Sequence, residues 1–379
     1  MIARSLFTPE HEEFRKSVRV FFAEEVIPNR ERWEAQQHVD RRLWNKAGEK
    51  GLLCMTMPEE FGGLGVDRTY STVLMEEQTY SGDSGAGFSL HSDIVAPYIH
   101  NFGSQAQKAK YLPRMATGEL VGAIAMTEPG TGTDLQAIKT TALAEGDHYV
   151  LNGSKTFITN GYLSDLVIVV AKTGTSGEGA KDISLLLVEA DSPGFSKGRP
   201  LKKIGMHAQD TCELFFENVR VPKANLLGQE GNGFIMLMQE LAWERLMIAI
   251  TSIAGAEVAL KDTLEYTRNR KVFGKPVADY QNTRFRLAEI KAELAIGRVY
   301  VDRCIELVLN KKLGVDDAAI AKMWSSDMMC KVIDQCLQLH GGYGYMLEYP
   351  IARAWIDSRA QRIYGGSNEI MKELIARTL

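Results

Sequence analysis

The chain has 379 residues, of which 45% are apolar and 24% are charged, and its formal net charge is −4. This composition is that of a folded globular protein, and it excludes a wholly disordered chain. The near balance of charge provides no basic field for nucleic acid or anionic lipid, so any anionic ligand needs a local cluster. The five cysteines include no C-x-x-C pair, which excludes a disulfide framework and offers no metal site.

The first residues and the apolar runs indicate the cellular location of the protein. A cap residue, Thr8, is followed by Pro9, which predicts a helix that begins there. Because Met1 stands so close to this helix, we expect no signal or transit peptide and a bacterial cytoplasmic protein; a processed chain of the mitochondrial matrix is the alternative. The longest apolar runs, at 166–171 and 183–188, are about a third of a membrane helix, so no membrane span is expected.

Three regions of different texture follow one another along the chain. Residues 1–120 are expected to be helical: apolar residues recur near a 3.6-residue period from Phe14 to Val26, and Pro28 is expected to end that helix. Residues 121–225 predict an all-β domain, a barrel or sandwich. Its expected strands are 149–151, 166–172, 183–189 and 211–217, the last with Cys212, Leu214 and Phe216 on one face.

Long helices are expected beyond residue 226. The stretches 233–269 and 282–309 are rich in Leu, Ile, Met and Ala, and the break at 270–276 separates them. Helices of this length favour a bundle over residues 226–379. The order is therefore α, then β, then α, which predicts an α+β fold without the alternation of a parallel nucleotide-binding sheet.

The stretch from Ala125 to Asp134, AMTEPGTGTD, lies at the first domain boundary. It holds two glycines, three threonines and a proline in ten residues. Small side chains and free backbone N–H groups suit an anionic or heteroaromatic cofactor, but a capped surface turn explains the composition equally well. Neither a P-loop nor a strand-linked G-x-G-x-x-G is present.

These ten residues resemble the first signature of the acyl-CoA dehydrogenase flavoproteins. Four further stretches agree with that family in order and spacing, so the resemblance covers essentially the whole chain. It implies an N-terminal helical domain, a middle β-barrel or sandwich domain and a C-terminal four-helix bundle, with FAD as cofactor and a homotetramer, a dimer of dimers, as the assembly. The four stretches are 156–161, 270–275, 338–344 and 363–370.

In that family the two middle-domain stretches wrap the isoalloxazine ring of FAD. Thr133 stands where the family usually has Ser, and Phe157 where many members carry Trp, so each keeps the hydroxyl or the aromatic face. Hydroxyl and backbone N–H groups at Thr127 and Thr159 are expected at the polar edge of the ring. The resemblance implies flavin contacts at Ala125, Met126, Thr127, Gly132, Thr133, Phe157, Ile158 and Thr159.

The C-terminal stretches are implied to bind the rest of the cofactor. Between residues 261 and 298 there are nine Lys and Arg against five Asp and Glu, which would attract a pyrophosphate, although a solvated helix face explains such a run as well. His340 is expected to be a packing histidine or one beside FAD rather than a catalytic one. The resemblance places Arg270, Phe273 and Gln281 on the adenosine and pyrophosphate, Gln338, Leu339, His340, Gly341 and Gly342 on the FAD of a neighbouring subunit, and Ser367, Asn368 and Glu369 on the cofactor.

The family removes an α proton with a carboxylate and transfers the β hydride to flavin N5, which yields a trans-2-enoyl-CoA. In many members that carboxylate stands near the C-terminus, where this chain has Gly365. The long-chain and isovaleryl branches place it at the position of Glu244, inside the apolar run 241–250 and without a cation three or four residues away. Burial would raise the pKa of such a carboxyl into the range of a general base. Glu244 is therefore the expected base, and Glu369 is its nearest rival.

The substrate contacts are implied around these positions. Arg245 is expected to orient the acyl-CoA or the carboxylate, while Gly365 and Gly366 leave room where another base would stand. The full set of expected substrate contacts is Thr133, Ala242, Trp243, Arg245, Gly365 and Gly366.

The resemblance implies an FAD-dependent acyl-CoA dehydrogenase of fatty-acid β-oxidation that passes electrons to electron-transfer flavoprotein. The sequence of residues 363–377 is most similar to that of the long-chain branch, which implies a preference for long acyl chains. A branched-chain or other acyl-CoA dehydrogenase is the first alternative. A non-catalytic acyl-CoA or flavin-binding relative is suggested by Gly365, and an acyl-CoA oxidase is disfavoured because the chain lacks that group's extra C-terminal domain.

Overall fold

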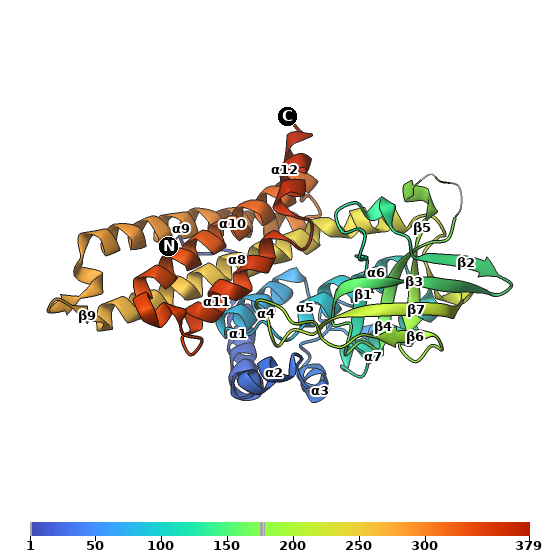
Figure 1. Ribbon diagram of the computed structural model, residues 1–379, viewed down its shortest axis with the longest axis horizontal. Coiled ribbons are helices and arrows are strands. Elements are labelled where there is room, and N and C mark those ends of the chain that lie inside the picture. The colour runs from blue at the N-terminus through green and yellow to red at the C-terminus, as the bar shows by residue number, and fades with distance from the viewer. Residues whose placement is uncertain (1, 175–176, 178) are drawn as a thin grey trace.

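Helices, strands and again helices follow one another in the computed structural model, which describes residues 2–174, 177 and 179–379 (Figure 1). Strands β1–β7 lie at one end of the molecule, the long C-terminal helices run away from them to the end that carries β9, and the N-terminal helices pack along the underside. This arrangement confirms the predicted α+β fold. The first strand begins at Gly122 and the first long C-terminal helix at Gly233, while the domain boundaries at 120 and 225 stay predictions.

The N-terminal part begins with α1 (Pro9–Phe21), at the residue that the sequence indicates. The backbone N–H of Thr8 donates to His11 Nδ1 over 3.0 Å and so closes the first turn. The helix end differs from the prediction, because α geometry is lost after Phe21. A π turn and a 3-10 turn follow, and Pro28, which has no N–H to donate, lies in the latter. The other helices of this part are α2 (Arg30–Gln36), α3 (Arg41–Glu49), α4 (Arg68–Tyr80), α5 (Phe88–Leu90), α6 (Ala96–Phe102) and α7 (Gln105–Ala116).

Strands β1–β8 of the middle part form one eight-stranded mixed sheet whose path runs β6-β7-β3-β2-β4-β5-β8, with β1 paired parallel to β4. Two predicted strands have the bounds that the sequence indicates, and two are longer than predicted. Four short strands were not predicted. The strands are β1 (Gly122–Ala125), β2 (Thr141–Glu145), β3 (His148–Thr159), β4 (Leu166–Lys172), β5 (Ile183–Glu189), β6 (Phe195–Lys197), β7 (Thr211–Pro222) and β8 (Leu226–Leu227).

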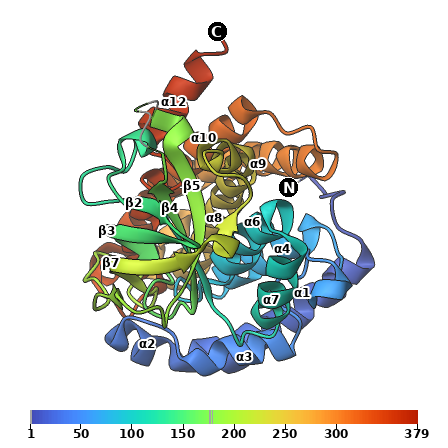
Figure 2. The ribbon, with the colours of Figure 1, turned by 90° about the vertical axis from the view of Figure 1, so that its right-hand side faces the viewer.

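β4 and β5 are buried on both faces, which explains their unbroken apolar sequences. Leu166, Ile168 and Val170 of β4 share a core with α6 and α7. Val167 and Val169, on the opposite face, share a second core with residues of β3 and β7, so the sheet curves over its own apolar face as a sandwich does. Figure 2 looks along the molecule from this end, with the strands in front of the long helices.

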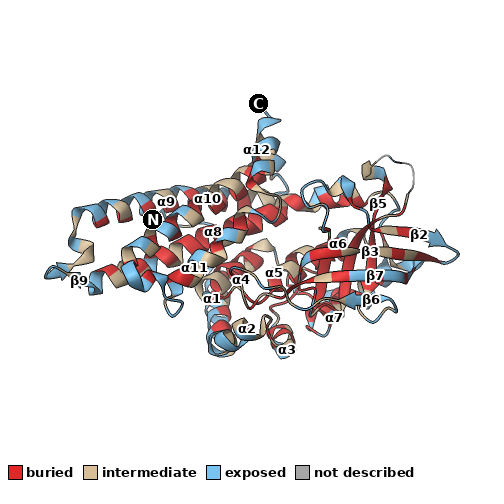
Figure 3. Ribbon diagram, viewed as in Figure 1, coloured by how far each residue is buried: buried red, intermediate tan, exposed pale blue. Residues whose placement is uncertain are grey.

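The C-terminal part is a bundle in which three long helices and one short helix pack together. Its central member, α8, is 37 residues long and is buried on nearly all sides along the middle of its length (Figure 3). In the described part of the chain, no helix is both long and apolar enough to cross a membrane. The bundle is made of α8 (Gly233–Asn269), α9 (Gln281–Leu309), α10 (Val315–His340) and α11 (Pro350–Ser358), with the hairpin β9 (Lys271–Val272) and β10 (Lys275–Pro276) after α8, and α12 (Asn368–Ala376) at the end.

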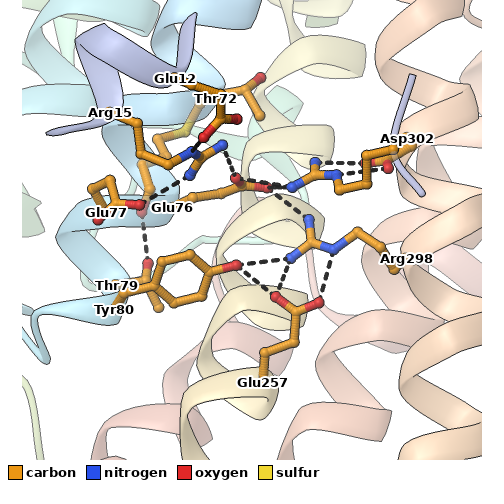
Figure 4. A network of polar contacts seen from close by, with 12 residues as sticks. Glu12, Arg15, Thr72, Glu76, Glu77, Thr79, Tyr80, Glu257, Arg298 and Asp302 are labelled. Atoms are coloured by element: carbon orange, nitrogen blue, oxygen red, sulfur yellow. Dashed lines mark hydrogen bonds and ion pairs between the residues drawn. The ribbon is translucent and has the colours of Figure 1, made fainter. Parts of the chain in front are cut away.

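A buried ionic network joins the N-terminal helices to the bundle (Figure 4). Glu76 of α4 is fully buried, and its carboxylate pairs with Arg4 at 2.9 Å, Arg15 of α1 at 3.0 Å and Arg298 of α9 at 2.7 Å. Arg298 also pairs with Glu257 of α8. Because a buried charge is tolerated only when it is paired, these contacts hold the two helical parts in one relative position.

Candidate active site

The two flavin-like stretches of the middle domain lie against each other. The backbone N–H of Thr156 donates to the carbonyl of Thr127 over 2.9 Å. Lys155 is fully buried, and its Nζ donates to the carbonyl of Met126 over 3.0 Å and to Glu128 Oε1 over 2.9 Å. Glu128 in turn accepts the backbone N–H groups of residues 139 and 140, so one buried ion pair anchors both ends of the 126–140 loop.

Burial lowers the pKa of Lys155 to about 8, against the attraction of Glu128. Burial opposes ionisation of Glu128 as well, but Lys155 and the surrounding donors outweigh it and lower its pKa. The pair is therefore ionised at neutral pH, when each member is the main compensation for the other.

Lys155→Met is expected to loosen the 126–140 loop and to weaken FAD retention. A buried Glu128 without its cation costs about 3–5 kcal/mol of stability, and we expect about a tenfold rise in the Kd for FAD because the loop is no longer preorganised. Fluorescence titration of the apoprotein with FAD measures the affinity. Lys139→Met, which changes an exposed lysine of the same loop, is the matched control. Unchanged affinity in Lys155→Met would show that the ion pair does not support the cofactor loop.

Phe157 is held outward in a form that suits an aromatic ligand. It is 68% exposed and has a φ of +59°, a left-handed conformation that bulky residues rarely adopt. The register of β3 against β7 shifts between Lys155 and Ile158, and this bulge leaves Ile158 buried in the sheet core. Thr127 and Thr159 are half-buried, whereas Gly132 and Thr133 are exposed, so hydroxyls, small residues and an aromatic face are available together. These groups fit a flavin ring.

Glu244 lies on α8 and is only 8% exposed. Its Oε1 accepts a hydrogen bond of 3.1 Å from the hydroxyl of Tyr98, a fully buried residue of α6. Burial raises the pKa of Glu244 to about 7; Tyr98 and Arg245 oppose the rise and Glu240 adds to it. The expected proton acceptor is therefore a carboxyl that is poised between its two protonation states at neutral pH.

The neighbours of Glu244 on α8 differ in their surroundings. Trp243 is buried beneath the guanidinium of Arg68, which lies 4.5 Å from its ring centroid. Arg245 is also buried, and its Nε has no hydrogen-bond partner within the described residues. Ala242 is half-buried. Nε1 of Trp243 also has no hydrogen-bond partner within the described residues, so two of the three predicted substrate contacts on this helix have an unused donor, and Arg245 is the charged one.

Gly365 lies against Ile248, which follows the expected base by one turn of α8. A Cβ built on it would stand 2.4 Å from Cδ1 of Ile248, the residue four positions after Glu244, and its φ is +67°. A side chain at this position would meet α8 and adopt a strained backbone. The C-terminal position therefore holds no carboxylate, and the α8 position beside it does.

The rival Glu369 is placed differently. It is exposed in the first turn of α12, where backbone and Ser367 donors lower its pKa. Asn368 is buried, and its amide bonds to Lys322, Ser326 and other groups of α10. Lys322 also donates to the carbonyl of Gly366 over 2.8 Å, so α10 fixes the whole turn. An exposed carboxylate of lowered pKa is a weak proton acceptor, which favours Glu244.

A cavity of about 330 Å³ lies beside these groups. Thr251 lines it on α8, two turns beyond Glu244 on the same face, and Tyr364 lines it next to Gly365. Its wall also includes Gly87, whose carbonyl accepts a hydrogen bond of 3.1 Å from the amide of Asn160 in the second flavin-like stretch. The face of α8 that carries Glu244 and the C-terminal turn thus border one cavity, and the second flavin-like stretch is bonded to its wall through Gly87. The volume is typical of small-molecule sites.

The remaining predicted cofactor residues gather at the opposite end of the bundle. The guanidinium of Arg270 lies 5.6 Å from the ring of Tyr343, directly after residues 338–342. Phe273 is 94% exposed, and Gln281 is exposed at the start of α9. At about 1.5 Å per residue, Glu244 and the end of α8 at Asn269 are roughly 38 Å apart along the helix. Within each half of the predicted FAD site the residues lie close together. The two halves themselves are far apart in one chain.

His340 is held by its own bundle. Its ring stacks on Tyr266 at 4.2 Å, and its Nδ1 lies 2.9 Å from the carbonyl of Cys336. Burial lowers its pKa. These contacts are those of a packing histidine within its own subunit, and the predicted place beside the FAD of a neighbouring subunit stays a prediction. The nearby basic residues Lys261, Arg268 and Lys291 line a second cavity of about 540 Å³, but Glu257 and Glu265 line it too, so their charge is partly balanced.

Two residues of the site were not predicted from sequence. Tyr98 precedes Glu244 by 146 positions, and no local pattern links them. Lys155 did carry a signal, because it shares the inward parity of Tyr149 and Leu151 along one strand. Among the described residues no group of three or more His, Cys, Asp and Glu could hold a metal ion.

Comparison with known proteins identifies the family. Three family descriptions match the chain: the acyl-CoA dehydrogenase N-terminal domain over residues 8–119, the middle domain over 123–219 and the C-terminal domain over 231–379. The chain belongs to the acyl-CoA dehydrogenase family. This confirms the resemblance, and with it a flavoprotein oxidoreductase of fatty acid metabolism that uses FAD.

Individual relatives span nearly the whole chain. The long-chain specific acyl-CoA dehydrogenase of Rattus norvegicus mitochondria is 53% identical over 99% of this chain and 88% of its own. The mitochondrial isovaleryl-CoA dehydrogenase of Oryza sativa is 36% identical over 99% and 92%. A solved acyl-CoA dehydrogenase from Geobacillus kaustophilus is 48% identical with a TM-score of 0.98 over 99% of both chains. Another from Bacillus anthracis, complexed with FAD, is 35% identical with a TM-score of 0.92 over 98% of this chain and 67% of its own.

Proposed function

We propose that this acyl-CoA dehydrogenase oxidises long-chain acyl-CoA to trans-2-enoyl-CoA in β-oxidation, with Glu244 as the acceptor of the α proton. The observation that carries the proposal is the placement of Glu244: a buried carboxyl with a pKa of about 7, one helical turn before Ile248, which Gly365 contacts, and two turns before Thr251 in the wall of the cavity. Bound FAD supplies the acceptor for the β hydride. The chain itself contributes the base, the cavity and the exclusion of water.

We assign roles to the other predicted site residues as part of the same proposal. Met126, Thr127, Phe157 and Thr159 hold the flavin ring, with Ala125, Gly132, Thr133 and Ile158 shaping the same loops. Arg245, whose Nε has no partner among the described residues, orients the acyl-CoA or the carboxylate of Glu244. The acyl chain lies in the cavity between α8 and Tyr364. Because Glu244 is itself buried, its carboxylate is a stronger base than it would be in water.

The long-chain preference rests on the 53% identity to the rat long-chain enzyme. A branched-chain preference is the alternative, supported by the 36% identity to the rice isovaleryl-CoA dehydrogenase. Anaerobic titration of the FAD-loaded protein with saturated acyl-CoAs of increasing length, and with isovaleryl-CoA, tests both. Flavin bleaching that is strongest with long chains supports the proposal, whereas stronger bleaching with isovaleryl-CoA supports the alternative. No bleaching with any thioester would overturn the proposed reaction.

The proposed assembly is a homotetramer in which FAD is shared between subunits. The roughly 38 Å along α8 between Glu244 and the hairpin is longer than an extended dinucleotide. Arg270, Phe273, Gln281 and residues 338–342 are therefore proposed to contact the FAD of a neighbouring copy. The exposure of Phe273 and of Tyr345, at 94% and 84%, is consistent with a surface that another subunit covers.

The electron acceptor and the location complete the proposal. The reduced cofactor must pass its electrons on, and electron-transfer flavoprotein is the proposed partner. The bacterial cytoplasm is the proposed location. The mitochondrial matrix is the alternative, to which the name of the rat relative points.

A further inference from the structure

Tyr98 is the one hydrogen-bond partner of the Glu244 side chain in the described part of the chain. It comes from α6, which begins directly after a π turn at His91–Val95, and its ring packs against Phe102. Its hydroxyl donates to Glu244 Oε1 over 3.1 Å, and both side chains are buried. A phenol that is buried this deeply needs a partner, and here the partner is the proposed base.

The other charged groups around Glu244 are paired elsewhere or lie on its own helix. Glu240 accepts a hydrogen bond of 2.7 Å from Asn101, and Arg245 follows Glu244 directly. On α4 the guanidinium of Arg68 covers Trp243, and the π turn places Asp93 near Arg68. On α10, Lys322 is bonded to Gly366 and Asn368. None of these groups donates to Glu244.

We propose that Tyr98 is a positioning residue for proton transfer: its hydroxyl holds Oε1 of Glu244 and leaves Oε2 free to take the α proton. The proposal rests on the proposed role of Glu244 as base. A donor to the charged carboxylate stabilises it, so Tyr98 opposes the rise in pKa that burial causes. Without this hydroxyl a larger fraction of Glu244 would be protonated, and thus inactive, at neutral pH.

Tyr98→Phe tests the proposal because it removes one oxygen and keeps the ring. A hydrogen bond to a charged group corresponds to about one unit of pKa or more, so the acidic limb of kcat/KM should move to higher pH by about one pH unit. We expect kcat to fall about tenfold at neutral pH, with KM for acyl-CoA within about twofold of the wild-type value. At pH values above the acidic limb Glu244 is fully ionised in both proteins, so any remaining loss of kcat in Tyr98→Phe measures the loss of orientation.

Tyr111→Phe is the matched control. Tyr111 is also fully buried and also donates to a glutamate, Glu189, over 2.8 Å, but it lies on α7. The Tyr111→Phe variant should be less stable than the wild type, but the acidic limb of its kcat/KM profile should stay at the wild-type pH. A second variant moves the limb the other way: 3-fluorotyrosine at position 98 is a stronger donor and should shift it to lower pH.

Infrared difference spectra provide a readout that is independent of turnover. The carboxyl band that disappears in Glu244→Gln should titrate at higher pH in Tyr98→Phe. A limb and a band that stay at the wild-type pH in Tyr98→Phe would overturn the role of Tyr98. Undiminished turnover in Glu244→Gln would instead overturn the proposed base, so the two failures are distinguishable.

Discussion

Glu244→Gln should lower acyl-CoA oxidation about 10³-fold while FAD stays bound, which is the effect expected when a general base is lost. The amide has nearly the shape of the carboxyl and can still accept the hydrogen bond of Tyr98, so packing on α8 is kept. It cannot take a proton from the α carbon. Anaerobic stopped-flow bleaching of the flavin isolates this chemical step, and the flavin absorbance of the purified variant shows that the cofactor is retained.

The control for this prediction is Glu240→Gln, one turn earlier on the same helix. Glu240 raises the pKa of Glu244 by its like charge, so its removal should shift the acidic limb slightly to lower pH and leave turnover within about twofold of wild type. Wild-type activity falls as pH drops through the pKa of Glu244 near 7, because the base must be ionised. If Glu244→Gln bleaches at the wild-type rate, the base lies elsewhere.

Glu76→Gln should destabilise the fold by about 3–5 kcal/mol, the cost of removing one member of a buried ionic cluster. Burial opposes ionisation of Glu76, but Arg298, Arg4 and Arg15 outweigh it and lower its pKa. The amide would leave these three cations with one negative charge fewer, and its NH2 group would face a guanidinium. Urea unfolding, followed by tryptophan fluorescence, measures the loss.

The sign of the pH dependence provides a second check on Glu76. A carboxyl whose folded pKa is lowered contributes stability above its unfolded pKa, and that contribution is lost as pH falls through the folded value. The wild type should therefore lose this stability only in acid, and Glu76→Gln should lack that part of the decline. Glu373→Gln, which breaks an exposed i,i+4 pair with Arg377, should change stability by about 0.5 kcal/mol or less. A loss as small in Glu76→Gln would contradict the structural role of the network.

The elements that the sequence predicts well are those that carry their own signal. β4 and β5 have the predicted bounds because strands buried on both faces are continuous apolar runs, and α8 has them because a long helix averages over many residues. β1 and β8 were not predicted, since two to four residues hold too little pattern and are stabilised mainly by pairing with β4 and β5.

The sequence alone determines the chemical parts of this enzyme. The order of the five signatures identifies the family, Gly365 excludes a C-terminal carboxylate, and the apolar run around Glu244 predicts a buried base. These properties depend on the residue types present and on their neighbours in the sequence, so the sequence alone is enough to predict them.

Only the tertiary structure decides how these parts are held. It pairs Lys155 with Glu128 beside the loops that are predicted to bind flavin, brings Tyr98 to Glu244 across 146 positions and separates the two halves of the predicted FAD site by the length of α8 from Glu244 to Asn269. Such contacts depend on helices and strands that are far apart in the chain and packed by burial as a whole. No local pattern encodes them, because the free energy that fixes them is released only when the complete core forms.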